Sequence, residues 1–299
     1  MKVLITGADG QVGWELQQTG PADVEITALR RADLDIADLS AVRSVIQQLQ
    51  PGLVINAAAY TAVDKAEEEA ERAYGVNEDG AANIARAVKD CSARLIHLST
   101  DFVFDGNQLK PYLPEDEPRP TGVYGASKLQ GERAVVAETN GRAVVLRTAW
   151  VYSVHGSNFV KTMLRLMAER DELKIVADQV GTPTWAKELA KAIWLIADKT
   201  DMQGIYHWTD DGTATWYDFA VAIQKEAREL GLLQKMIPLK PIKTEEYPTP
   251  AKRPPYSVLD KTSTCTALGY TPPHWRESLR RMLTEYGGLR EKIGTRTED

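Results

Sequence analysis

The sequence predicts an α/β fold in which a doubly wound parallel sheet is followed by a smaller C-terminal lobe. In the first half of the chain, short β-branched runs alternate with helix-like segments. The runs are continuously apolar, as in strands that helices cover on both faces. After about residue 150, turn residues break the pattern into shorter elements, which indicates a second and smaller unit.

Individual elements follow from this pattern in chain order. Strands are expected at residues 3–6, 24–29, 53–56, 95–99 and 143–147. Apolar residues at helical spacing predict helices at residues 81–88, 123–137, 184–199 and 215–230. Thr215 is expected to cap the last of these helices, which should end at Gly231.

Composition and charge narrow the class of protein. Among 299 residues, 36 Lys and Arg face 42 Asp and Glu, so a net charge of −6 offers no basic field for nucleic acid or an anionic membrane. Two cysteines and four separated histidines exclude a disulfide scaffold and a zinc finger. No apolar stretch approaches the ~20 residues that span a bilayer. We therefore expect a cytoplasmic protein.

A glycine-rich turn follows the first strand and opens the first helix. It reads G-x-x-G-x-x-G at Gly7, Gly10 and Gly13. Such glycines let backbone N–H groups approach a pyrophosphate, although a glycine triplet can also be a purely structural turn. Its place at the first strand-to-helix junction favours a dinucleotide. We expect a dinucleotide-binding domain at 1–150 and a mainly substrate-binding lobe at 151–299, with helix 184–199 packing back on the first domain.

The end of the second strand indicates which dinucleotide is bound. An acidic residue there would bind the ribose hydroxyls of NAD, but the chain has Arg30 and Arg31. Arg30 can pair with a 2′-phosphate, which favours NADPH, with NADH and a solvated arginine pair as the alternative. Asp35 and Ile36 come next and could face the adenine, or Asp35 could be an exposed loop acid.

Polar residues suited to carbonyl chemistry lie at the end of the fourth strand and on the helix that follows it. Thr100 and Asp101 end that strand, where doubly wound sheets place their ligands. Tyr124 and Lys128 are four residues apart and share a helix face. An ammonium beside a phenol can lower its pKa from about 10 and prepare it for proton transfer. A tyrosine and a lysine at this spacing can also occur by chance, so the pair indicates a catalytic site only together with the motifs around it.

Together these motifs resemble the extended short-chain dehydrogenase/reductases. Longer stretches are similar to one family among them, the dTDP-4-dehydrorhamnose reductases, and the resemblance covers almost the whole chain. The stretches are residues 10–16, 58–67, 147–152, 158–159 and 247–251. The resemblance implies a Rossmann-like fold and NADPH-dependent reduction of the C4 ketone of dTDP-4-dehydro-6-deoxy-L-mannose to dTDP-L-rhamnose.

The same resemblance implies roles for individual residues. Thr100 would hydrogen-bond the substrate oxygen, Tyr124 would deliver the proton, and Lys128 would lower the pKa of Tyr124 and hold the nicotinamide ribose. The residues expected against the dinucleotide are Gly7, Gly10, Gln11, Val12, Gly13, Arg30, Asp35, Ile36, Ala57, Ala58, Ala59, Tyr60, Thr61, Tyr124 and Lys128. Those expected against the sugar nucleotide are Thr100, Asp101, Trp150 and Arg253, although Trp150 could instead be a core aromatic.

The resemblance also raises the question of a magnesium ion. Some members of this family dimerise around Mg²⁺ held by glutamates from three segments, which correspond here to Glu15, Glu285 and the position of Lys187. A lysine ammonium repels a dication, and Glu188 lies about 100° further around the helix. We therefore expect no metal between subunits and a monomer or a homodimer.

The alternatives to this reductase are other activities of the superfamily and a non-catalytic subunit. Dehydratases of the superfamily need an acid beside the Thr-Asp pair, where this chain has Phe102, which cannot transfer a proton. Another nucleotide-sugar reductase or an epimerase of the same superfamily would use the same Tyr124 and Lys128 pair. A non-catalytic dinucleotide-binding subunit shares the fold, but it has no chemical reason to keep that pair intact. The nucleotide of the sugar is not predicted.

Overall fold

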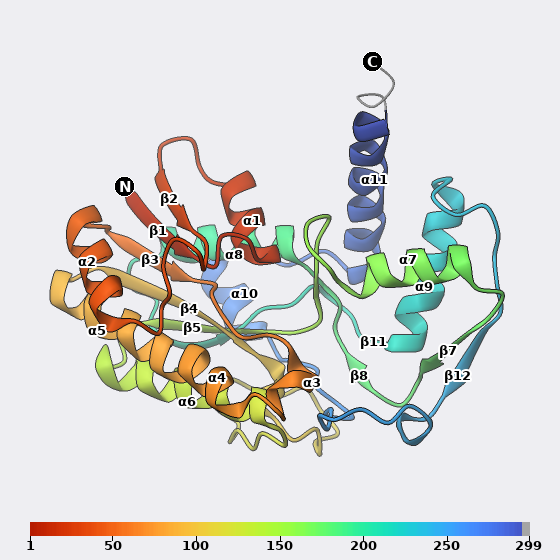
Figure 1. The fold of residues 1–299 in the computed structure, drawn as a ribbon, viewed down its shortest axis with the longest axis horizontal. Coiled ribbons are helices and arrows are strands. Elements are labelled where there is room, and N and C mark those ends of the chain that lie inside the picture. Colours follow the sequence, from red (N-terminus) through yellow and green to blue (C-terminus); the bar gives the residue numbers. More distant parts are fainter. Residues whose placement is uncertain (295–299) are drawn as a thin grey trace.

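The central sheet has six parallel strands in the order β10-β5-β4-β3-β1-β2 in the computed structural model, which describes residues 1–294 (Figure 1). The strands are β1 (Lys2–Thr6), β2 (Glu25–Leu29), β3 (Leu53–Asn56), β4 (Arg94–Thr100), β5 (Val144–Thr148) and β10 (Gly204–His207). The expected doubly wound α/β fold is confirmed. Strand β10 lies beyond residue 150, so the C-terminal half of the chain completes the sheet.

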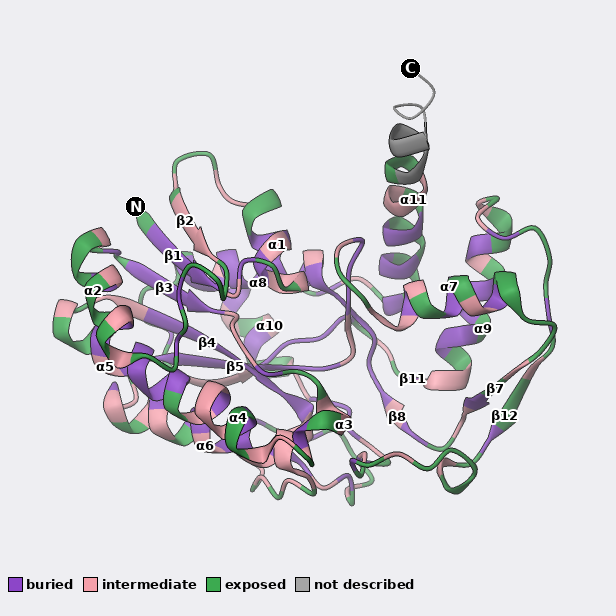
Figure 2. Ribbon diagram, in the orientation of Figure 1, coloured by how far each residue is buried: buried purple, intermediate pink, exposed green. Residues whose placement is uncertain are grey.

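Helices cover both faces of this sheet, and its inner strands are buried along their length (Figure 2). Val3 and Ile5 pack on one face, whereas Leu4 packs on the other. The first face is covered by α1 (Gln11–Gln18), α8 (Ala186–Asp198) and α10 (Thr262–Leu268), and the second by α2 (Leu39–Leu49), α5 (Gly80–Cys91) and α6 (Val123–Glu138). Burial on both faces explains why the strands are continuously apolar in sequence.

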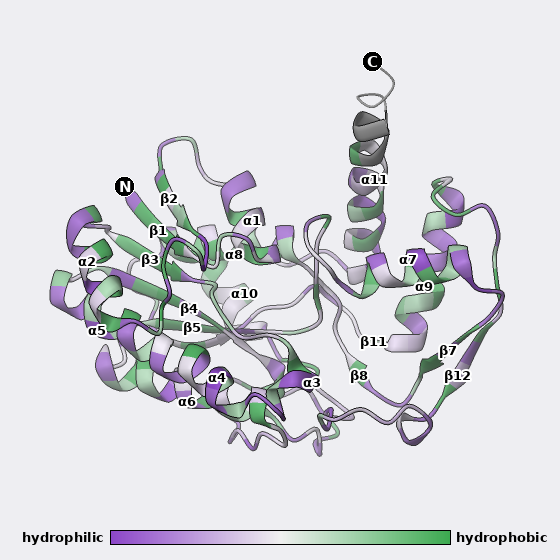
Figure 3. Ribbon diagram, viewed as in Figure 1, coloured by the Kyte–Doolittle hydropathy of each residue, from purple (hydrophilic) through white to green (hydrophobic). Residues whose placement is uncertain are grey.

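A smaller lobe has a core of its own, which includes the buried rings of Trp185, Phe219 and Trp275. Its helices are α7 (Phe159–Glu169), α9 (Trp216–Glu229) and α11 (Trp275–Gly294). Its short strands pair as β6 (Val151–Tyr152) with β9 (Thr184–Trp185), β7 (Leu173–Val176) with β12 (Leu239–Ile242), and β8 (Val180–Gly181) with β11 (Ala214–Thr215). The hydropathy of α7 and α9 alternates between apolar and polar along each helix, as their one-sided packing requires (Figure 3).

Short elements complete the described chain. They are α3 (Val63–Ala66), α4 (Ala70–Tyr74), the π-helical turn η1 (Gly75–Asp79), η2 (Asp101–Val103) and η3 (Thr244–Glu246). Helix α9 begins with the expected cap, because the amide of Asp218 donates to Thr215 Oγ1 at 3.0 Å. Helix α8 packs on α1. The division into two domains at residue 150 stays a prediction. The last five residues of the predicted lobe, 295–299, lie outside the described chain. Among residues 1–294, no helix has the length and apolar character needed to cross a membrane.

Candidate active site

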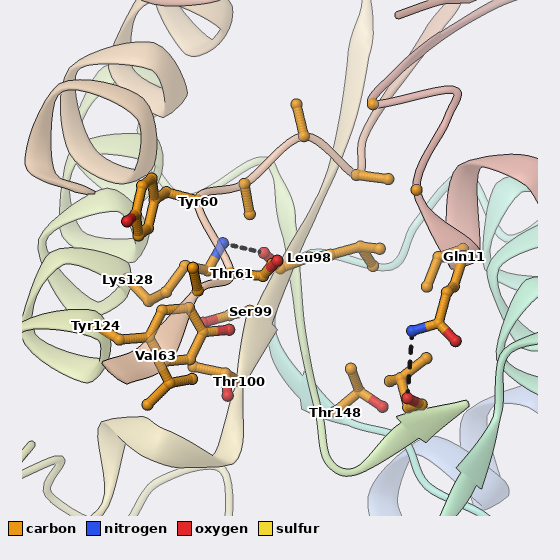
Figure 4. Close-up of a pocket in the computed structure, with 18 of the residues that line it drawn as sticks. Gln11, Tyr60, Thr61, Val63, Leu98, Ser99, Thr100, Tyr124, Lys128 and Thr148 are labelled. Atoms are coloured by element: carbon orange, nitrogen blue, oxygen red, sulfur yellow. Dashed lines mark hydrogen bonds between the residues drawn. The ribbon is translucent and has the colours of Figure 1, made fainter. Parts of the chain in front are cut away.

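The carboxyl ends of the parallel strands open into a cavity of about 830 Å³ (Figure 4). Its wall combines the loops after β1, β3, β4 and β5 with residues of α6, α9 and the chain near Arg253. Ligands of doubly wound sheets bind at this edge. The buried hydroxyl oxygens of Ser99 and Thr148 in the wall have no hydrogen-bond partner within the described chain. A bound ligand can satisfy these polar groups.

The glycine turn brings the backbone of β1 close to that of the neighbouring loop. Gly7 has φ +74°, and a Cβ there would lie 2.6 Å from Ala58 N. A Cβ on Gly13 would lie 2.2 Å from the carbonyl oxygen of Gly7, so Gly13 allows α1 to pack against the turn. Gly10 is the N-cap of α1 and has no side chain to cap it, so the first amides of the helix are available to an anion. The turn residues that line the cavity include Gly7, Gly10, Gln11 and Val12, whereas Gly13 lies behind them.

Of the two arginines after β2, it is Arg31 that lines the cavity. Arg30 instead pairs with Asp33, with Nε–Oδ2 at 2.8 Å and Nη2–Oδ1 at 3.0 Å. Hydrogen bonds from Arg30 lower the pKa of Asp33 to about 2. The Arg30 guanidinium is thus directed to a neighbour in the same loop, and the role expected of Arg30 toward the cofactor stays a prediction.

The loop after β3 forms a further part of the wall and is held by Asn77. The Tyr60 amide donates to Asn77 Oδ1 at 2.8 Å, and Asn77 Nδ2 donates to the Tyr60 carbonyl at 3.1 Å. Asn77 Nδ2 also donates to Ser127 Oγ on α6 at 3.0 Å. One buried amide on the π-helical turn thus joins this loop to α6. The expected residues of this loop that line the cavity are Ala57, Ala58, Ala59, Tyr60 and Thr61, and Asp35 and Ile36 line it from the loop after β2.

Thr100, Tyr124 and Lys128 come together at the end of β4, and all three line the cavity (Figure 4). Lys128 Nζ donates to the carbonyl oxygen of Leu98 at 2.6 Å, which fixes the ammonium beside the strand. The Tyr124 hydroxyl shares a hydrogen bond with the Thr100 side chain. Thr100 Oγ1 in turn donates to Asp101 Oδ1 at 3.0 Å. The tertiary fold thus assembles the predicted catalytic set.

Burial dominates the proton affinities of this set. Burial raises the pKa of Tyr124 to about 12, against the opposing hydrogen bond to Thr100. Burial also lowers the pKa of Lys128 to about 8, against the opposing charge of Glu132. The expected lowering of the Tyr124 pKa by Lys128 is not found, because loss of water around the phenol outweighs its neighbours. At pH 7 the phenol is protonated and Lys128 is mainly a cation.

Asp101 lies buried between Thr100 and Phe102. Burial raises the pKa of the Asp101 carboxyl to about 6. The Phe102 ring also lines the cavity and meets the Tyr124 ring edge-on, with centroids 5.5 Å apart. An aromatic ring therefore occupies the position at which elimination chemistry would need an acid.

The other two residues expected against the sugar nucleotide also line the cavity. Trp150 follows β5 with φ +45°, and its half-buried ring both packs against the core of the smaller lobe and lines the cavity. Arg253 is held by Asp64, with Nη1–Oδ1 at 3.0 Å and Nη2–Oδ2 at 2.8 Å. That carboxylate neutralises much of the Arg253 charge before any diphosphate could bind.

A family model described as the RmlD substrate binding domain matches residues 1–287. The dTDP-4-dehydrorhamnose reductase of Sinorhizobium fredii is 43% identical over 95% of this chain and 97% of its own length. The enzyme of the same name from Escherichia coli K12 is 40% identical over 95% of this chain and 98% of its own length. This chain belongs to the dTDP-4-dehydrorhamnose reductase family.

Solved structures of the family have the same fold. The Bacillus anthracis dTDP-4-dehydrorhamnose reductase, solved in complex with NADP, is 38% identical with a TM-score of 0.90, over 95% of this chain and 99% of that one. The Clostridium acetobutylicum dTDP-4-dehydrorhamnose reductase is 42% identical with a TM-score of 0.88, over 95% and 98%. A Thermus thermophilus UDP-glucose 4-epimerase, at 22% identity and a TM-score of 0.79 over 96% and 99%, shares the fold alone.

The Mg²⁺ site implied by the dTDP-4-dehydrorhamnose reductase family does not fit these residues. Lys187 Nζ lies 2.7 Å from Glu285 Oε2, so an ammonium already pairs with one expected ligand. Glu15 Oε1 accepts from Ser153 Oγ at 2.6 Å, and burial raises the pKa of Glu15 to about 6. Glu188, the nearest substitute, is fully buried and engaged by other side chains: Lys191, Tyr270 and Arg281. The absence of a bridging metal stays a prediction.

Several residues of the wall were not predicted from the sequence. Arg31 could have been predicted because it adjoins Arg30 after the second strand, and Ser99 because it belongs to the polar end of the fourth strand. Trp216 was recognised only as part of a helix, and the sequence carries no local signal for Asn77. Both reach the site through contacts between elements distant in sequence. The unpredicted wall residues include Arg31, Leu34, Val63, Leu98, Ser99, Thr148 and Trp216.

Proposed function

We propose that this chain reduces the C4 ketone of dTDP-4-dehydro-6-deoxy-L-mannose to dTDP-L-rhamnose with NADPH. The observation that carries the proposal is the cluster of Thr100, Tyr124 and Lys128 in one cavity with the glycine turn. Relatives at about 40% identity are named for this activity, and one related structure was solved with NADP.

Reduction of a ketone requires a hydride at carbon and a proton at oxygen. NADPH supplies the hydride when it is bound. We assign the proton to Tyr124, whose hydroxyl is neutral at pH 7 because burial raises its pKa to about 12. Thr100 hydrogen-bonds the same substrate oxygen and orients it toward the phenol. An alkoxide is more basic than a phenolate, so proton transfer from Tyr124 remains favourable.

Lys128 stabilises the phenolate that remains after proton transfer. Lys128 lies on α6 with Tyr124, and its ammonium is fixed by the carbonyl oxygen of Leu98 on β4. A cation in this desolvated site acts strongly on a nearby developing anion. We also assign to Lys128 the contact with the nicotinamide ribose, so one residue serves both the cofactor and the acid.

The dinucleotide would lie along the glycine turn and the loop after β3. The amides at the start of α1 favour the pyrophosphate. Arg31 supplies the cation for a 2′-phosphate, with NADH as the weaker alternative cofactor. We place the sugar nucleotide against Asp101, Trp150 and Arg253. The proposed setting is the cytoplasm, for a monomer or a homodimer.

Turnover by the purified chain tests the proposal. We expect oxidation of NADPH that depends on the dTDP-4-dehydro sugar, with dTDP-L-rhamnose as the product. A C4 epimer formed without net consumption of NADPH would indicate an epimerase. Binding of NADPH with no turnover of the sugar nucleotide would indicate a regulatory subunit, and either result refutes the proposal.

A further inference from the structure

Two stacked tryptophans form the wall where the cavity meets the smaller lobe. Trp150 and Trp216 both line the cavity, with ring centroids 3.6 Å apart and an angle of 4° between their planes. Trp150 follows β5, whereas Trp216 is the first residue of α9. Parallel indoles in this arrangement make a flat apolar surface.

Trp150 has a backbone conformation that bulky residues rarely adopt. Its φ of +45° lies in the left-handed region. The other described non-glycine residues with positive φ, which are Gln50, Ser92 and Asn140, all lie just after helices, where such turns are common. Trp150 ends no helix, and its carbonyl accepts from Thr184 N at 3.2 Å. Strain of this kind persists only where the surroundings hold the residue.

The smaller lobe supplies those surroundings. Gly181 lies so close to Trp150 that a Cβ there would be 2.5 Å from Cε2 of the indole. Gly181 belongs to β8, which pairs with β11, and Trp216 follows β11 directly. Trp216 Nε1 donates to Gln179 Oε1 at 3.1 Å, and its ring packs 4.7 Å from that of Phe159. The pairing of β8 with β11 therefore places both Gly181 and Trp216 against the Trp150 indole.

We infer that Trp216 is a positioning residue, which together with Gly181 holds the Trp150 indole in the wall that receives the sugar nucleotide. The inference rests on the proposed function, in which Trp150 contacts that substrate. The dinucleotide is assigned to the first 61 residues and α6, which leaves the tryptophan wall to the sugar nucleotide. An indole that is already locked loses less freedom when a deoxy sugar or a pyrimidine packs on it.

Steady-state kinetics on the full chain tests this role. Trp216→Leu removes the stacking partner, whereas Gly181→Ala keeps it and adds a methyl group against the Trp150 indole. Each variant should raise KM for the sugar nucleotide about tenfold, the loss expected for one aromatic contact. The value of kcat should change less than about threefold, and NADPH affinity should stay unchanged. Trp216→Phe keeps a flat ring and should restore most of the wild-type KM.

A matched control and a spectroscopic signal separate positioning from general stability. Tyr217→Leu changes the next residue of α9, which does not line the cavity, and should leave KM unchanged. Two stacked indoles give an exciton couplet in circular dichroism. Trp150→Phe and Trp216→Leu should both lose this couplet, whereas Tyr217→Leu should retain it.

The outcomes distinguish this inference from the proposed function. A normal KM in both Trp216→Leu and Gly181→Ala overturns the inference and leaves the function standing. Equal losses of kcat and NADPH affinity in Trp216→Leu and Tyr217→Leu would show a merely structural role, which also overturns it. Absence of turnover in the wild-type chain refutes the proposed function, and with it the assignment of this wall to the sugar nucleotide.

Discussion

Lys187 on α8 donates from Nζ to Glu285 Oε2 on α11 at 2.7 Å, which joins two helices from distant parts of the chain. Glu15 on α1 is near enough that the charges of both residues shift its pKa. A fixed ammonium thus lies among carboxylates that a divalent ion would otherwise have to bridge. The pair therefore makes a metal unnecessary for balancing charge at this place.

We expect the oligomeric state to be independent of magnesium. Sedimentation in Mg²⁺ and then in EDTA should give the same species, because the Lys187 ammonium repels a dication. Lys187→Glu is the matched variant, since it replaces the cation with a third carboxylate. That variant alone should show a Mg²⁺-dependent rise in melting temperature. A wild-type dimer that dissociates in EDTA would contradict the prediction.

Tyr124→Phe should remove the proton donor while keeping the ring contact with Phe102. We expect kcat to fall by roughly 10² to 10⁴, the usual contribution of general acid catalysis. NADPH binding, followed by fluorescence, should stay within about twofold of wild type because the phenyl ring still packs where the Tyr124 ring did. Near-normal kcat in this variant would exclude Tyr124 as the acid.

Arg31→Ala should lower kcat/KM with NADPH more than kcat/KM with NADH. A charge-assisted contact with a 2′-phosphate contributes about 1.5–3 kcal/mol, so the ratio of the two values should fall at least about tenfold. Arg30→Ala is the control, because Arg30 pairs with Asp33 outside the cavity wall. A larger change in that control than in Arg31→Ala would restore the original expectation for Arg30.

Asp210 is fully buried between the sheet and the smaller lobe, and burial raises its pKa from 3.8 to about 7. The folded state therefore holds this proton more tightly, so the contribution of Asp210 to stability is lost as pH rises between about 4 and about 7. Asp210→Asn removes that loss. Urea unfolding at pH 5 and pH 8 should show the variant gaining relative to wild type at pH 8, by roughly 2–3 kcal/mol more than at pH 5. An equal difference at both pH values would contradict the assignment.

Most of the sheet, the glycine turn and the shared helix face of Tyr124 and Lys128 could be predicted from the sequence. Each depends on short-range patterns: strands buried on both faces are apolar throughout, Gly7 is required where two backbones meet, and Tyr124 and Lys128 share a helix face by spacing alone. The edge strand β10 was not predicted. It has only four residues, three of them half-buried, so its pattern differs little from that of a loop.

Which side chains share the cavity, and how tightly they hold protons, depends on the tertiary fold. Arg31 lines the cavity while Arg30 pairs with Asp33, and the pKa of Tyr124 depends on how completely the fold removes water from the phenol. Trp150 and Trp216 meet only because the ladder of β8 and β11 carries α9 to the end of β5. Contacts and desolvation arise between segments distant in sequence, so no local spacing encodes them.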